Sequence, residues 1–325
     1  MKPLSFLALY LFSQLLLAAD LQLDLPIRCT LGRDCFIQNY YDHDASAGWQ
    51  DYACGSLAYD KHTGTDFRLK HKQQMQAGIA VLAAAPGTVQ AVRDSEPDIS
   101  IRDRPLSVKN PKEAGNGVRI AHGDGWETQY SHLRQGSIEV CPGQRVQAGD
   151  VLGQVGLSGK TEFPHVDFTV RKNGQAVDPF GPERTACGEA TKTLWSDAAR
   201  TQLAYQPTAI LIAGFADRVL PVPELQSGEA LLSALPANAP AQAFHIEIMG
   251  VHQGDMETMR ITAPDGKVMV ERMAPIEKNQ AVRQTYLGKR KSASNWPTGE
   301  YLGYYSLQRS GKMIAETTIK IQVNL

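Results

Sequence analysis

The sequence predicts an all-β protein, with an antiparallel β-sheet domain followed by a smaller β-sandwich of the immunoglobulin-like type. Short apolar runs interrupted by glycine fill residues 79–178, as expected of short strands joined by tight turns. A second set of runs that alternate apolar and polar residues follows residue 206 and continues to the C-terminus. Helical periodicity is scarce, and only residues 196–205 are expected to form a short helix.

Two domains agree with the length of 325 residues, which exceeds the usual size of one compact unit. We place the boundary at residue 206, which gives a first domain over residues 20–205 and a second over residues 206–325. The second domain is expected to fold by itself and to be dispensable for chemistry. Its two histidines, His245 and His252, lack the spacing of metal ligands and are expected to be ordinary strand and loop residues.

The overall charge excludes some classes of partner. Thirty-three basic residues stand against thirty-four acidic ones, for a net charge of −1. Such a balance creates no general attraction for nucleic acid or for an anionic membrane. Recognition must therefore come from a local site.

The first nineteen residues have the features of a secretory signal peptide. Lys2 precedes an apolar stretch over residues 4–17, and small residues follow it up to Ala19. A membrane anchor is the alternative, but the apolar stretch is shorter than a bilayer requires. We expect cleavage after Ala19 and a mature protein in the periplasm or outside the cell.

Five cysteines are expected to oxidise in such a compartment. Cys29 and Cys35 could close a short loop, and Cys141 with Cys187 is a second candidate pair, which would leave Cys54 unpaired. A zinc site made of cysteines is the competing interpretation, and the absence of a C-x2-C spacing disfavours it.

The first motif with chemical potential is His62 and Asp66, which flank Gly64. Histidine and aspartate are both good zinc ligands. Alone, this spacing is weak, because a structural histidine is the commoner explanation.

Two further segments carry histidines in a strand context. Residues 115–133 are expected to form a β-hairpin with Gly-Asp-Gly at its tip and His132 near the end of its second strand. His165 and Asp167 lie two apart in an expected strand, so they should share one face. Residues 94–114 are charged and contain three prolines, which predicts a long surface loop that could wall a groove.

Taken together, these motifs resemble the LytM/lysostaphin family of zinc endopeptidases, whose hallmarks are H-x3-D, a Tyr-x-His-Leu strand and H-x-H. The resemblance spans residues 59–180. Intervening segments at residues 83–89, from residue 142 and at residues 177–180 also match, in the same order.

The resemblance implies that His62, Asp66 and Asp167 hold one zinc ion and that His132 and His165 are the catalytic pair beside it. Asp167 stands where the family has histidine. A carboxylate can also bind zinc, but its charge lowers the net charge of the centre and should slow hydrolysis.

Two other residues of the matched segment have less certain roles. Asn116 could contact the substrate, although Gly-Asn-Gly is also favourable turn chemistry. His122 is expected to be structural.

The function that the resemblance implies is zinc-dependent hydrolysis of peptide cross-links in bacterial peptidoglycan. The main alternative is an inactive module that binds peptidoglycan or activates a separate cell-wall amidase. A third hypothesis, a general extracellular protease, shares the same site and differs in the shape of its groove.

Overall fold

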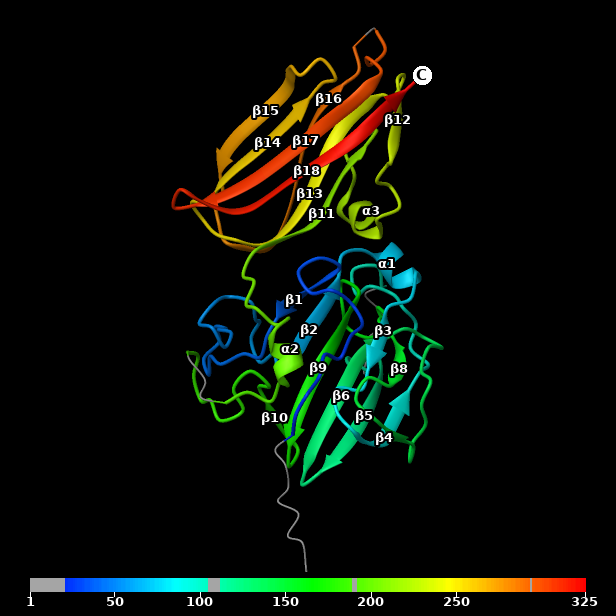
Figure 1. The fold of residues 1–325 in the computed structure, drawn as a ribbon, viewed down its shortest axis with the longest axis vertical. Coiled ribbons are helices and arrows are strands. Elements are labelled where there is room, and N and C mark those ends of the chain that lie inside the picture. The colour runs from blue at the N-terminus through cyan, green and yellow to red at the C-terminus, as the bar shows by residue number, and fades with distance from the viewer. Residues whose placement is uncertain (1–20, 105–111, 189–191, 293) are drawn as a thin grey trace, which may run out of the picture.

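The computed structural model describes residues 21–104, 112–188, 192–292 and 294–325. Figure 1 shows two β-rich lobes stacked along the long axis, the first lobe of residues 21–205 and the second lobe of residues 206–325. The signal peptide expected over residues 1–19 lies outside the described residues. Among the residues described, no helix is both long and apolar enough to cross a membrane.

The first lobe is built on one large antiparallel sheet with the strand order β1-β2-β9-β6-β5-β4-β7, and β10 pairs with β9. Its strands are β1 (Cys35–Asn39), β2 (Thr65–Leu69), β4 (Gly87–Arg93), β5 (Asn116–Gly123), β6 (Trp126–Leu133), β7 (Arg145–Val146), β9 (His165–Lys172) and β10 (Gln175–Val177). A smaller sheet pairs β3 (Ala80–Leu82) with β8 (Val151–Gln154). The helices of this lobe are α1 (Lys72–Gln76) and α2 (Asp197–Arg200).

Alternation along the strands gives the large sheet an apolar face and a polar face. Phe67, Tyr130 and Phe168 are fully buried on the apolar face. Asp66 and Asp167, one residue away along β2 and β9, point to the other side because successive side chains of a strand alternate. The polar face is therefore where chemistry can take place.

The hairpin predicted over residues 115–133 is confirmed as strands β5 and β6. At its tip Asp124 and Gly125 both have positive φ, 47° and 75°. Two such residues form the tight turn whose twist matches that of paired strands, and aspartate and glycine tolerate this conformation best.

The helix predicted over residues 196–205 is shorter than expected. The Ser196 hydroxyl caps it by accepting from the Ala199 amide, and α2 ends at Arg200. Beyond it Leu203 is buried, and the Tyr205 hydroxyl donates to Asp51 at 2.8 Å. Tertiary contacts of these side chains therefore replace the last helical turns.

The second lobe contains two sheets. The three-stranded sheet has the order β11-β13-β16 and the five-stranded sheet the order β12-β18-β17-β14-β15. Their strands are β11 (Ala209–Ala216), β12 (Ala234–Pro236), β13 (Ala241–Val251), β14 (Met256–Thr262), β15 (Val268–Pro275), β16 (Gln280–Arg290), β17 (Gly299–Arg309) and β18 (Lys312–Asn324), and α3 (Val222–Ser227) lies beside them. Apolar residues of both sheets share one buried cluster, and the immunoglobulin-like assignment stays a prediction.

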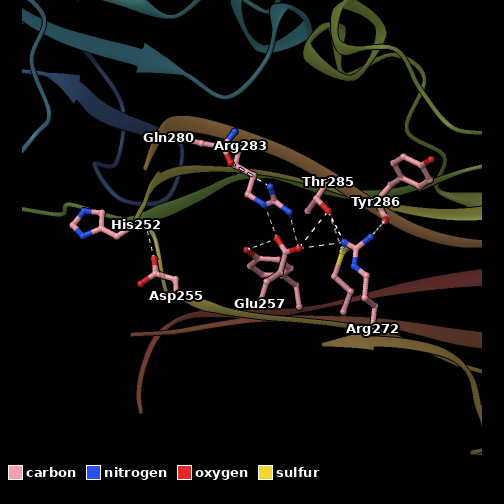
Figure 2. A network of polar contacts seen from close by, with 10 residues as sticks. His252, Asp255, Glu257, Arg272, Gln280, Arg283, Thr285 and Tyr286 are labelled. Carbon is pink, nitrogen blue, oxygen red and sulfur yellow. Dashed lines mark hydrogen bonds and ion pairs between the residues drawn. The ribbon is translucent and has the colours of Figure 1, made fainter. Parts of the chain in front are cut away.

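An ionic cluster joins the edges of these two sheets (Figure 2). The buried carboxylate of Glu257 in β14 accepts from Arg283 of β16 at 3.0 and 3.1 Å and from Arg272 of β15 at 3.2 Å. Arg272 also donates to Thr285 of β16 at 2.6 Å. Every partner lies within the second lobe, so the cluster stabilises that lobe alone.

The two lobes share apolar core as well. Leu211, Leu225 and Met249 of the second lobe belong to the same buried cluster as Phe67 and Leu69 of the first. A boundary at residue 206, as the sequence suggests, therefore separates two sets of sheets but cuts through this shared cluster, while a further cluster lies wholly within the second lobe.

The disulfides agree only in part with the pairs expected from the sequence. Cys29 and Cys35 are bonded, as expected. The second bond joins Cys54 to Cys187, which corrects the candidate pair of Cys141 with Cys187, and Cys141 is free and exposed. The reason is tertiary: the Gly188 amide donates to the Tyr52 carbonyl at 2.9 Å, which places Cys187 beside Cys54.

We expect thiol titration of the unreduced mature protein to detect a single reactive cysteine, which Cys141→Ser should remove. Exchanging Cys54 and Cys187 together for serine should lower the free energy of unfolding by about 2–4 kcal/mol, because that bond closes a long loop. The matched control is the exchange of Cys29 and Cys35, whose separation is 6 residues against 133, and which should have a smaller effect in urea titrations. Two reactive thiols in the wild type would contradict the pairing.

Candidate metal centre

The structure brings together the three residues predicted to hold a metal ion. Ligand atoms of His62, Asp66 and Asp167 all lie within 4.8 Å of one another. Asp66 and Asp167 are direct partners in the antiparallel pair of β2 and β9, and His62 precedes β2 by a short turn. Asp66 and Asp167, 101 positions apart in the sequence, thus share one point on the polar face.

Asp66 occupies the middle of the cluster. Its Oδ2 accepts from the Asn39 side-chain amide at 2.7 Å. Its Oδ1 lies 3.3 Å from His62 Nε2 and 3.5 Å from His165 Nε2. His62 Nε2 and Asp66 Oδ1 are both buried and lack a hydrogen-bond partner among the residues described. Buried polar atoms normally have partners, so these two are suited to a cation between them.

Asp167 completes the cluster from the partly exposed side. The Thr169 hydroxyl donates to its Oδ1 at 3.4 Å. A Cβ atom on Gly64 would lie 1.8 Å from the same oxygen. The glycine between the two residues of the first motif is therefore required for the close approach of β9.

Charge-charge effects within the cluster favour a cation. Burial raises the pKa of Asp167, and the nearby Asp66 charge raises it further. Burial also opposes ionisation of Asp66, but His62 and His165 outweigh it and lower the pKa of Asp66. For His62, burial lowers the pKa, but the charge and hydrogen bonding of Asp66 together with the charges of Asp167 and Asp42 raise it overall. One imidazole and two carboxylates form a donor set that fits zinc and leaves a position open for substrate.

His132 reaches the site because the end of β6 is irregular. Ser131 pairs with Gly117 and Leu133 with Asn116, so His132 is an extra residue in a β-bulge. Its φ of 64° is unusual for a residue other than glycine. Its ring centroid lies 4.6 Å from that of His165. Without the bulge, alternation would send His132 into the core together with Tyr130.

Both catalytic candidates present the same nitrogen to the site. His132 Nδ1 lies 2.7 Å from the Ser158 carbonyl, and His165 Nδ1 lies 2.9 Å from the Phe163 carbonyl. A carbonyl only accepts, so Nδ1 carries the proton in each ring and Nε2 can accept one. Burial and then the neighbouring His165 lower the pKa of His132 to about 3, so His132 is neutral near pH 7.

A cavity lies on β4, β5 and β6 and reaches Ser131, next to the cluster. It has a volume of about 270 Å³, and Arg93, Gly117, Arg119 and Gln129 line it together with Ser131. Ser131 is the strand partner of Asp167. A cavity of about 980 Å³ lies elsewhere, near Trp126 and Lys172, at the opposite ends of β6 and β9 from the histidines. Of these two cavities, the smaller is nearer to the cluster, through Ser131.

Asn116 has a role different from the substrate contact expected from the sequence. Its side chain is fully buried, and its amide donates to the carbonyls of Glu96 at 2.8 Å and Leu133 at 3.2 Å. Its Oδ1 accepts from the Glu96 amide at 2.7 Å. These bonds hold the strand end next to His132 and engage both the nitrogen and the oxygen of the buried side-chain amide.

His122 agrees with its expected structural role. Its Nδ1 contacts the Pro86 carbonyl at 2.7 Å and its Nε2 contacts the Thr128 hydroxyl at 2.8 Å. The sequence did not indicate Asn39 or Tyr59, whose ring centroid lies 4.3 Å from that of His62. Only their position near the H-x3-D motif could have pointed to them.

Part of the chain is similar in sequence to known peptidases. Residues 60–179 match the model of peptidase family M23. The DD-carboxypeptidase/endopeptidase Mpg of Neisseria meningitidis is 38% identical over 81 residues, which cover 23% of this chain and 18% of that protein. The peptidoglycan DD-endopeptidase ShyA of Vibrio cholerae is 31% identical over 117 residues, or 36% of this chain and 22% of that protein. The chain thus matches about a fifth of the length of these relatives.

Among solved structures, the catalytic domain of the prophage-encoded M23 protein EnpA from Enterococcus faecalis is 26% identical, with a TM-score of 0.31, over 45% of this chain and 92% of that one. A zinc-containing peptidase from Vibrio cholerae is 25% identical, with a TM-score of 0.28, over 44% of this chain and 39% of that one. The matched segment of this chain contains His62, Asp66, His132, His165 and Asp167. Residues 60–179 therefore match peptidase family M23, of the LytM/lysostaphin type.

Proposed function

We propose that this protein is a zinc-dependent endopeptidase that hydrolyses peptide cross-links of bacterial peptidoglycan in the periplasm or outside the cell. One observation carries the proposal above all. Among the residues described, His62 Nε2 and Asp66 Oδ1 are buried without a hydrogen-bond partner, and ligand atoms of both residues lie within 4.8 Å of a ligand atom of Asp167. A divalent cation bound here would give both atoms a partner, and the match to peptidase family M23 indicates the class of reaction.

The residues of the site have two proposed roles, metal binding and proton transfer. His62, Asp66 and Asp167 would hold the zinc ion, which when bound supplies Lewis-acid activation for amide hydrolysis. His132 and His165 lie beside the cluster with Nε2 free to accept a proton. They can take a proton from the attacking water and return it to the leaving amine. The Ser158 and Phe163 carbonyls keep both rings in the required tautomer.

Two observations support peptidoglycan as the substrate. Both relatives described above are named as endopeptidases, and one of them as a peptidoglycan DD-endopeptidase. The cavity that reaches Ser131, the strand partner of Asp167, lies along β4, β5 and β6, so a peptide bound there would pass close to the cluster. Two disulfides and the expected signal peptide favour a compartment outside the cytoplasm.

We expect the purified mature protein to bind stoichiometric zinc and to release soluble fragments from purified sacculi with loss of cross-linked muropeptides. A chelator should stop the release, and added zinc should restore it, because the proposed activity depends on the metal that His62, Asp66 and Asp167 would hold. Metal analysis by mass spectrometry and chromatography of the released fragments measure both effects.

Asp66→Asn is the matched control, since it keeps the size of the side chain and removes the central charge. It should abolish both zinc binding and release. If the wild type holds zinc and binds sacculi but releases nothing, the inactive binding or amidase-activating module replaces the enzyme. Cleavage of unrelated proteins at the same rate as sacculi would favour the general protease.

A further inference from the structure

A buried ion pair joins the second lobe to the polar face of the first. Arg68 in β2 and Glu247 in β13 have exposed fractions of 1% and 0%, and Arg68 Nη2 lies 3.0 Å from Glu247 Oε1. Arg68 follows Asp66 by two residues on the same face of β2. Charges are rarely buried unless they are paired, so each of these groups depends on the other.

The Glu247 carboxylate is held in place by its own lobe. Its Oε2 accepts from the side-chain amides of Gln226 at 3.1 Å and Gln284 at 2.6 Å. Gln226 belongs to α3 and Gln284 to β16. These two donors direct the other oxygen, Oε1, toward Arg68.

The Arg68 guanidinium is fixed on the side of the first lobe as well. Nη1 donates to the Gln38 side chain, and Nε donates to the Leu69 carbonyl at 3.1 Å. With Glu247 as the third partner, the planar group lies over the Phe163 ring, 4.6 Å from its centroid. An arginine stacks in this way on an aromatic face, and a lysine could not reproduce both the fork and the stacking.

Phe163 contacts His165 through both its backbone and its ring. Its carbonyl accepts from His165 Nδ1 at 2.9 Å, and the two ring centroids lie 4.8 Å apart. His165 is also the strand partner of Arg68 across β2 and β9. A continuous series of contacts therefore runs from Glu247 of the second lobe through Arg68 and Phe163 to His165.

We infer that Glu247 is a positioning residue for His165: it holds Arg68 against Phe163, and thereby fixes the tautomer and orientation of the His165 ring. The inference rests on the proposed function, because it gives that function a contribution from the second lobe. The sequence suggested that the second lobe is dispensable for chemistry. The contacts indicate instead that it completes the site.

The experiment compares two buried carboxylates in the full-length protein. Glu247→Gln removes the charge that faces Arg68 and keeps the shape of the side chain. Glu257→Gln does the same to the cluster in Figure 2, where Glu257 is equally buried and is paired with Arg272 and Arg283 but contacts only the second lobe. Both variants should lower the unfolding temperature, and only the first should affect the site.

We expect Glu247→Gln to lower kcat on sacculi by about 10–100-fold, the usual range for a residue that orients a catalytic group, with zinc content unchanged. Glu257→Gln should leave kcat within about twofold of the wild type. Its ionic cluster is confined to the second lobe, and changes at well-separated sites act independently. Histidine labelled with ¹⁵N provides a second readout, with His165 assigned through His165→Gln. Its signals should show Nδ1 protonated in wild type and in Glu257→Gln, and a mixture of tautomers in Glu247→Gln.

A double variant covers the case in which Glu247→Gln folds poorly. Arg68→Met with Glu247→Leu replaces the buried pair by apolar side chains, which commonly restores stability. Because Met has no planar cation over Phe163, kcat should stay low although the protein is stable. Recovery of both stability and kcat in the double variant would overturn the inference.

So would His165 signals and kcat in Glu247→Gln that match those of Glu257→Gln. The two hypotheses fail separately. If the wild type binds zinc but cleaves no sacculi, the proposed function is wrong, and the labelled histidine alone then decides whether Glu247 positions His165.

Discussion

Replacing Asp167 with alanine is expected to abolish stoichiometric zinc binding. Its carboxylate is one of three groups that lie within 4.8 Å of one another, and its loss leaves only His62 and Asp66. Zinc sites in proteins need at least three protein ligands to hold the metal firmly. Metal analysis after dialysis, followed by calorimetric titration with zinc, measures the loss.

Asp178→Asn provides the control for this prediction. Asp178 is also a buried carboxylate of the first lobe, and it pairs with His43 at 2.8 Å, away from the cluster. It should keep the zinc content of the wild type. Equal zinc in wild type and Asp167→Ala would remove Asp167 from the ligand set.

Asp167→His tests zinc binding separately from the rate of hydrolysis. A neutral imidazole still binds zinc and leaves more positive charge at the centre, so hydrolysis near pH 7 should be faster than in the wild type. A variant that binds zinc yet never cleaves sacculi would favour the inactive module.

Replacing His132 or His165 with alanine should lower kcat by about 10²–10⁴-fold and leave zinc in place, since positioned general acids and bases contribute rate factors of that size. Neither residue belongs to the cluster of three groups within 4.8 Å. Single-turnover cleavage of a cross-linked peptide gives the rate, and metal analysis gives the occupancy.

His122→Ala is the control, because His122 bonds only to Pro86 and Thr128 in the first lobe. It should change kcat by much less than either catalytic variant. Loss of zinc in His165→Ala would instead assign His165 as a ligand. Zinc must be measured in this variant because His165 Nε2 lies 3.5 Å from Asp66 Oδ1.

Local patterns predicted a large part of the fold. The hairpin of β5 and β6 follows from alternation on both sides of a Gly-Asp-Gly turn, and its residues interact with near neighbours in the sequence. The helix after residue 196 was predicted too long, since contacts of Leu203 and Tyr205 with distant parts of the first lobe decide where it ends. Cysteine pairing was predicted only for the bond with a separation of 6 residues.

The sequence by itself determined which side chains of the predicted metal site share one face. His62 and Asp66 frame a short turn, and His165 and Asp167 alternate along one strand, so side-chain direction follows from strand geometry. These relations span a few residues, and chain geometry alone enforces them.

Only the tertiary structure decided the rest. A bulge turns His132 away from the core, and no residue type in the sequence marks it. The bond of Cys54 to Cys187 spans 133 residues, and the contact of Arg68 with Glu247 spans 179. Partners so far apart leave no periodic trace in the chain, because packing of the two lobes, and not local conformation, brings them together.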